Sequence, residues 1–235
     1  MVAYVVEGKR RRKIALINLE NKKEEQHEVP FMPMKFNWFP DNKSIAIVGF
    51  EGSDAWNPTE NIYLYSTETH KITKISNYPE GEKNRIHSMC ISDDGKSIIL
   101  ATSGSDRRIK VLKLNIVTKG ITTLPFVAFA LASMPNRNTV AISGKEISDA
   151  DRHVPCVIFL YDLDTGQYKK VNIAENLNDF QWIESMSFSP DGKKLAYVRV
   201  ENPGAKTLWT MNIDGSNKRE LISENYFITN LNWTE

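Results

Sequence analysis

The chain has 235 residues, with 30 lysines and arginines against 29 aspartates and glutamates, so its net charge is only +1. This balance excludes whole-molecule attraction to nucleic acid or to an acidic membrane. No run of roughly 18 consecutive apolar residues predicts a membrane-inserted segment. Its two cysteines, Cys90 and Cys156, occupy unmatched positions, which predicts buried thiols and no disulfide framework.

The N-terminus begins at once with strand-like residues, Val2-Ala3-Tyr4-Val5, and no secretory signal segment is visible. This indicates a cytoplasmic protein as the chain stands, and a periplasmic or secreted one if a leader was removed. The strongest local charge run follows at Lys9–Lys13. We interpret it as a solvated hairpin and not as a nucleic-acid contact, because no basic stripe interleaved with aromatic residues accompanies it.

A tight turn recurs along the chain, each time between two short apolar runs. Its copies are Phe39-Pro40-Asp41-Asn42, Ser92-Asp93-Asp94-Gly95, Met134-Pro135-Asn136-Arg137 and Ser189-Pro190-Asp191-Gly192. The residues that precede each turn lie 42 to 55 positions apart, and they are Trp38, Ile91, Ser133, Phe188 and, where the turn is missing, Trp233. A repeat of about 40–50 residues predicts a solenoid or a propeller.

Each copy of the repeat contains four short strands rich in β-branched and aromatic residues. In the last full copy they span 183–188, 195–200, 208–213 and 219–222, and apolar residues alternate with period two, which excludes a helical repeat. We therefore predict an all-β, five-bladed β-propeller forming a single domain. Its blades are residues 226–235 together with 1–30, then 31–77, 85–125, 126–173 and 182–223. Strand 228–233 would pair with strand 2–6 and close the ring, leaving no open edge.

The sharpest copy, residues 188–197 followed by 208–215, resembles the TolB-type, WD-like propeller repeat. The resemblance implies that the Ser-Pro-Asp-Gly turn is structural and carries no chemistry. Family members with protein partners have a sixth blade and an additional domain that this chain does not show, so those partners are not carried over. Similar repeats also form the gate of a separate hydrolase domain in prolyl-oligopeptidase-like enzymes. We therefore expect a monomeric, non-catalytic binding or scaffolding module without a cofactor, with a protein or a small ligand as partner.

The long loops of the predicted propeller gather on one face, where binding residues usually concentrate. They span 49–61, 78–85, 143–155 and 174–182. The loop residues that we predict to contact a partner are Trp56, Glu60, Asp149, Asp151, His153, Trp182 and Tyr226. Asp149, Asp151 and His153 alternate and could ligate a metal, but alternating polar residues also describe a solvated loop, so we predict no metal site.

The first strands of the repeats supply a second set of candidates, at the mouth of the channel. The aligned residues are Met34, His87, Phe129, Glu184 and Thr229, and the next layer is Lys35, Ser88, Ala130, Ser185 and Asn230. We select His87 and Glu184 as partner-binding residues. Glycosidases need two carboxylates, whereas Glu184 alone occupies a suitable position, so we predict no enzymatic activity. The alternatives are a glycosidase, the gate of a hydrolase, or a sugar-binding lectin with repeated pockets.

Overall fold

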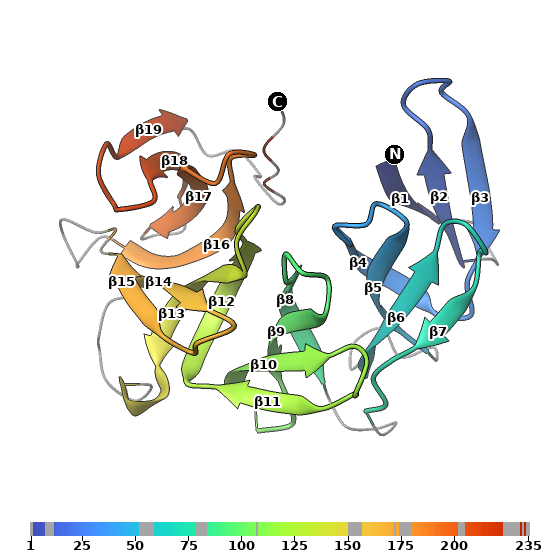
Figure 1. The fold of residues 1–235 in the computed structure, drawn as a ribbon, viewed down its shortest axis with the longest axis horizontal. Helices are drawn as coiled ribbons and strands as arrows, with labels where there is room; N and C mark the ends of the chain where they lie inside the picture. Colours follow the sequence, from blue (N-terminus) through green and yellow to red (C-terminus); the bar gives the residue numbers. More distant parts are fainter. Residues whose placement is uncertain are drawn as a thin grey trace. The chain divides into compact units, whose positions relative to one another are not determined.

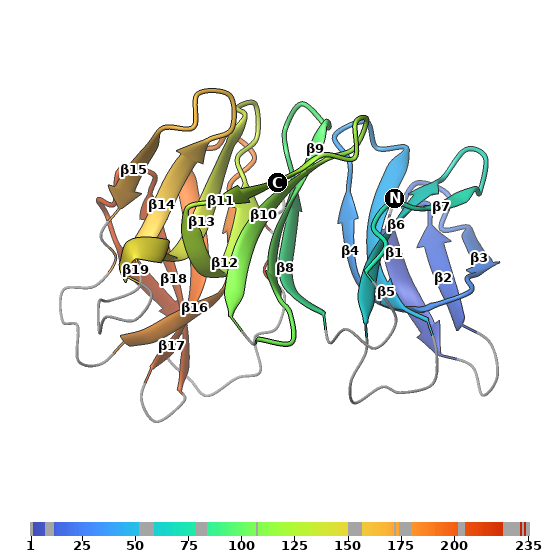
Figure 2. The same ribbon diagram turned by 90° about the horizontal axis from the view of Figure 1, so that it is seen from below.

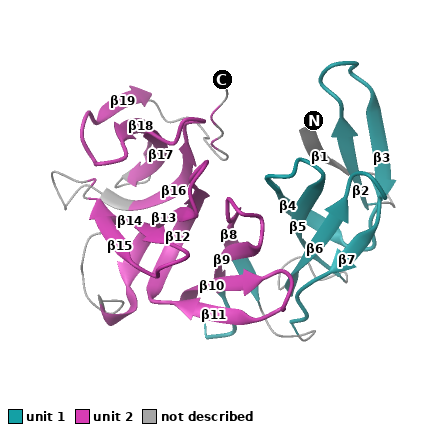
Figure 3. Cartoon of the chain, viewed as in Figure 1, with its two compact units in different colours: residues 1–86, 103–107 teal, residues 87–102, 108–235 magenta. Residues whose placement is uncertain are grey.

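The computed structural model describes all residues except 1, 8–11, 52–58, 79–83, 107, 150–156, 172, 174–179, 202–204, 223–230, 232 and 234–235. The chain divides into two compact units, which Figure 3 shows in different colours. Unit 1 contains residues 1–86 and 103–107, and unit 2 contains residues 87–102 and 108–235. The prediction of a single domain stays a prediction.

Unit 1 contains the first two antiparallel sheets (Figure 1). The first sheet has three strands in the order β1-β2-β3, and the second has four in the order β4-β5-β6-β7. Their bounds are β1 Val2–Glu7, β2 Arg12–Ile17, β3 Glu24–Glu28, β4 Met32–Trp38, β5 Ser44–Phe50, β6 Glu60–Ser66 and β7 Ile72–Lys74.

Three four-stranded sheets follow, each with its strands paired in chain order (Figure 2). The third sheet contains β8 Arg85–Ile91, β9 Ser97–Ser103, β10 Ile109–Asn115 and β11 Ile121–Leu124. The fourth contains β12 Phe126–Ser133, β13 Thr139–Glu146, β14 Val157–Asp162 and β15 Tyr168–Val171. The fifth contains β16 Phe180–Phe188, β17 Lys194–Glu201, β18 Lys206–Asn212 and β19 Arg219–Ile222.

This arrangement confirms the predicted fold class, an all-β chain of five antiparallel sheets of the propeller type. The first strands of the four complete sheets end at the predicted residues, Trp38, Ile91, Ser133 and Phe188. The strand bounds differ from the prediction mainly at the long loops. Strand β13 continues to Glu146 and is followed by a short 3₁₀ helix, Ile147–Asp149, whereas the sequence placed the loop from residue 143. Among the described residues, no helix is long and apolar enough to cross a membrane.

The turns between the first and second strands are built by their own side chains. The Ser189 hydroxyl donates to the Asp191 carboxylate over 2.6 Å, and that carboxylate accepts the backbone N–H of Lys193 over 3.0 Å. Gly192 then adopts a left-handed φ of 67°, which glycine tolerates at little cost. The turn after Ile91 repeats these bonds through Ser92 and Asp94. The turn is therefore structural, as the resemblance implies.

Apolar side chains from neighbouring sheets fill the core of each unit. In unit 1, Phe31 stacks on Tyr63 with ring centroids 3.7 Å apart, and both side chains are buried. In unit 2, Phe126 packs at 4.7 Å from Phe159. Each such side chain contributes about 1.5–3 kcal/mol by leaving water. Cys90 is buried as a free thiol, as predicted, whereas Cys156 lies outside the described residues.

Two described residues near the C-terminus, Leu231 and Trp233, contact the first strand of the fifth sheet. The backbone N–H groups of Leu231 and Trp233 donate to the hydroxyls of Ser185 and Ser187, each over 3.2 Å. This is the neighbour expected of the next first strand in a propeller. The predicted pairing of strand 228–233 with strand 2–6 falls mostly outside the described residues, so ring closure stays a prediction.

Candidate functional site

Three of the first strands contain a β-bulge at the same place in the repeat. Pairing shifts between Pro33 and Lys35, between Ala128 and Ala130, and between Ile183 and Ser185. The residues skipped by the pairing are therefore Met34, Phe129 and Glu184. A bulge re-aims its extra residue, and all three side chains are exposed. These are the residues that the sequence aligned at the channel mouth; aligned His87 is also exposed, and Thr229 lies outside the described residues.

The next residues along these strands connect one repeat to the next. In unit 2 the Ser88 hydroxyl accepts the backbone N–H of Leu131 over 3.1 Å, just as Ser185 accepts that of Leu231. Ala130, at the same layer of the fourth sheet, is buried. In unit 2, the described serines of this layer thus satisfy backbone groups of the following strand.

Four candidates of unit 2 lie on the exposed side of its first strands, and we call them the inner-strand surface: His87, Phe129, Trp182 and Glu184. Phe129 is 39 % exposed and Trp182 is 37 % exposed, unusually high values for large apolar side chains. Glu184 forms an ion pair of 2.6 Å with Lys206 of β18. The surface thus combines two exposed aromatics with a carboxylate that is already paired.

Glu60 occupies a different environment from the one predicted for it. It is the first residue of β6 and only 5 % exposed, not part of a solvated loop. Its carboxylate accepts the backbone N–H of Ile86 over 2.6 Å, and Lys35 Nζ donates to the Ile86 carbonyl over 2.5 Å. The Glu60 N–H donates to the Asn84 carbonyl over 3.0 Å, and Asn84 Nδ2 donates to the Glu60 carbonyl over 3.1 Å. Burial raises the pKa of Glu60, although these contacts oppose the shift. We call these four residues the Glu60 network, and it anchors the chain entering β8.

The remaining loop candidates are not placed by the structure. Trp56, Asp151, His153 and Tyr226 lie outside the described residues. Asp149 ends the 3₁₀ helix, and its side chain is not described. These residues stay predictions.

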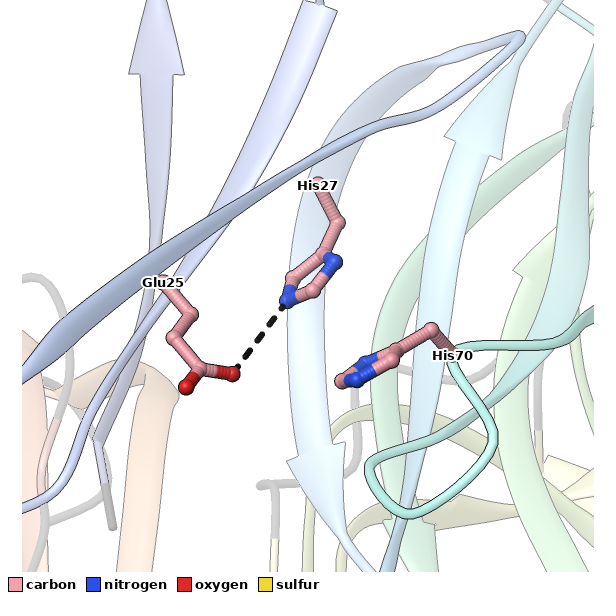
Figure 4. Close-up of side chains that lie close together, drawn as sticks. All are labelled: Glu25, His27 and His70. Atoms are coloured by element: carbon pink, nitrogen blue, oxygen red, sulfur yellow. Dashed lines mark ion pairs between the residues drawn. The ribbon is translucent and has the colours of Figure 1, made fainter.

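Among the described residues, the cluster best able to hold a metal was missed by the sequence analysis. It consists of Glu25, His27 and His70, whose donor atoms all lie within 4.8 Å of one another (Figure 4). Glu25 and His27 alternate on β3, so they share one face of the strand. His70 comes 43 residues later, in the turn between β6 and β7. The Glu-x-His pattern is visible in the sequence, but it is too common to predict a metal site by itself. The prediction also requires knowing that the β6–β7 turn lies against β3.

Comparisons with known proteins identify the fold. No family model and no curated protein matches the sequence. TolB from Acinetobacter baumannii is similar with a TM-score of 0.68 and 18 % identity, over 94 % of this chain and 52 % of that one. Puromycin hydrolase is similar with a TM-score of 0.65 and 14 % identity, over 92 % and 33 %.

A chain of the mitotic checkpoint complex is similar with a TM-score of 0.53 and 13 % identity, over 78 % of this chain and 49 % of that one. This protein therefore spans about half the length of TolB and a third of puromycin hydrolase. At these identities the likeness speaks for the fold alone. The chain has a TolB-like β-propeller fold.

Proposed function

We propose that this protein is a non-catalytic binding module that presents its inner-strand surface to a protein or a small ligand. The observation that carries the proposal is the exposure of Phe129 and Trp182 on paired strands. Aromatic side chains on a rigid support make strong contact anchors, because little conformational entropy is lost when a partner covers them. His87 and Glu184 add polar contacts beside them.

The fold similarities support this proposal in general terms. TolB and a chain of the mitotic checkpoint complex have the same fold, and the latter is named for an assembly of proteins. The predicted loop residues Trp56 and His153 would extend the binding surface. Hot spots concentrate in a few residues, so single substitutions are informative.

The proposal is tested by affinity capture followed by a binding measurement on whatever is captured. The protein is immobilised as wild type, as Phe129→Ala and as Trp182→Ala, and Val117→Ala serves as the control. Val117 is 79 % exposed in the turn between β10 and β11, away from the inner strands. We expect each aromatic variant to weaken the binding of the purified partner at least tenfold, corresponding to about 1.4 kcal/mol.

Two outcomes would count against this surface. The first is unchanged affinity of both aromatic variants with an intact fold. The second is an equal loss in Val117→Ala. Trp56→Ala and His153→Ala, measured in the same way, report on the loops.

A second candidate function is the propeller part of a larger hydrolase, favoured by the similarity to puromycin hydrolase. The two candidates differ in whether a separate catalytic domain accompanies the chain. Incubating the purified protein with puromycin and with chromogenic peptides tests for catalysis by the chain itself. Turnover that disappears in Glu184→Gln would overturn the non-catalytic proposal. Turnover only after adding a second, hydrolase polypeptide would favour the gating role.

A further inference from the structure

The cluster of Glu25, His27 and His70 joins two neighbouring sheets within unit 1. Strand β3 is the last strand of the first sheet, and its side chains alternate between exposed and half-buried. Glu25 and His27 are the half-buried ones. His70 sits in the β6–β7 turn with a left-handed φ of 56°, and its backbone N–H donates to Ser66 over 2.9 Å. Both elements are thus held by backbone hydrogen bonds.

The side chains converge on one small volume (Figure 4). The rings of His27 and His70 stack with centroids 4.3 Å apart, and His27 Nε2 lies 4.0 Å from Glu25 Oε2. A zinc ion with bonds of about 2.0–2.2 Å needs donors roughly 3.3–3.6 Å apart. The cluster is therefore wider than a filled site by about 1 Å, a distance that rotation of half-exposed side chains can close.

His27 has a nitrogen available for a ligand. Its Nε2 is buried and, in the described part of the chain, has no hydrogen-bond partner. A buried polar atom without a partner costs free energy, so such atoms are rare in folded proteins.

The neighbouring side chains orient the other two donors. The Tyr65 hydroxyl lies 2.8 Å from His70 Nδ1, which leaves His70 Nε2 for a ligand. The Tyr65 side chain is buried, so it holds this contact away from solvent. Lys23 pairs with Glu25 Oε1 over 2.8 Å, while Glu25 Oε2 lies toward His27. Outer partners of this kind accompany the ligands of most metal sites.

We propose that Glu25, His27 and His70 form a binding site for a divalent transition-metal ion of the zinc class. Two imidazole nitrogens with one carboxylate select zinc, copper or nickel over magnesium and calcium, which prefer oxygen ligands. Three protein ligands leave at least one position for water or a further donor. Such an ion would connect β3 to the β6–β7 turn and would stabilise the folded state, since the unfolded chain does not hold these ligands together.

The test measures Zn²⁺ binding to the metal-free protein of residues 1–235 by competition with a chromophoric chelator. We expect one site with a preference for Zn²⁺ over Mg²⁺ of at least tenfold. His27→Gln and Glu25→Gln should each weaken binding at least tenfold. Glu24→Gln is the matched control, because it makes the same charge change on the same strand, where Glu24 accepts a bond from Gln26.

His70→Asn tests the third ligand without losing the turn, since asparagine tolerates a left-handed φ. Lys119→Asn is its control, because Lys119 has a φ of 61° and occupies the equivalent place in the β10–β11 turn. Cu²⁺ added to the wild type should give an electron paramagnetic resonance spectrum with two coordinating nitrogens. Equal Zn²⁺ affinity in wild type, His27→Gln and His70→Asn would overturn the proposal, as would a spectrum without nitrogen coupling.

Discussion

Gly144 lies on β13, opposite the bulged strand β12. It pairs with Ala128, one residue before the bulge at Phe129. A Cβ at Gly144 would overlap the Val127 carbonyl oxygen and would lie 2.8 Å from Ala128 Cα. Both obstacles are backbone atoms, so a change of side-chain rotamer cannot relieve them. Gly144→Ala should therefore strain the fourth sheet.

The magnitude follows from the nature of these contacts. Overpacking a core typically costs about 1–3 kcal/mol, and we expect the upper end because only backbone movement makes room. The smaller entropy of the unfolded alanine variant offsets about 0.4–1 kcal/mol. The net loss of unfolding free energy is thus about 2 kcal/mol or more, which lowers the melting temperature by roughly 4–8 °C for a chain of this size.

Thermal and urea unfolding, followed by circular dichroism, measure this loss. Gly104→Ala is the control, because its nearest obstacle would be Asp106 Oδ1 at 3.8 Å. We expect that control to be neutral or stabilising by up to about 1 kcal/mol. The reasoning is refuted if Gly144→Ala unfolds within about 0.5 kcal/mol of Gly104→Ala, the range of an unremarkable surface substitution.

Three further predictions concern stability. Gly192→Val places a β-branched residue at a φ of 67°, so it should lower the melting temperature while leaving partner affinity per folded molecule unchanged, as titration of the folded variant would show. Burial raises the pKa of Glu60 above its ordinary 4.5, so the native state binds more protons than the unfolded state. The unfolding free energy should therefore fall as pH rises through that raised pKa. Urea titrations at several pH values should show this fall in the wild type and not in Glu60→Gln. Deleting residues 228–235 removes the bonds from Leu231 and Trp233 to β16, so it should unfold the protein at lower urea, and an unchanged midpoint would show that the segment contributes nothing.

The repeat made most of the fold predictable from the sequence. Turn residues such as Pro190-Asp191-Gly192 specify a hairpin locally, so the ends of four first strands could be placed to the residue, even at the weakly matching Ser133. The bulges were not predicted, because a bulge is a relation between two strands. Gly49 and Gly144 pair with the residues just before two of the bulges, Pro33 and Ala128. These glycines indicate a bulge only once the strand pairing is known.

The candidate site was less predictable, because it depends on contacts between repeats. The exposure of His87, Phe129 and Glu184 followed from aligning the repeats, since equivalent positions have equivalent surroundings. The burial of Glu60 did not, because it results from a contact with Ile86 in the next sheet. The meeting of His27 with His70 likewise depends on how two sheets pack, which no local pattern encodes.

The repeated bulge also separates the chemistry of the surface from the integrity of the sheets. The positions skipped by the pairing hold a thioether at Met34, an aromatic ring at Phe129 and a carboxylate at Glu184, yet the flanking residues pair in the same way in all three sheets. Natural variation can therefore exchange these exposed side chains while leaving the ladder of hydrogen bonds intact. Each of the three positions offers a place to introduce a new exposed side chain without changing the strand pairing of its own sheet.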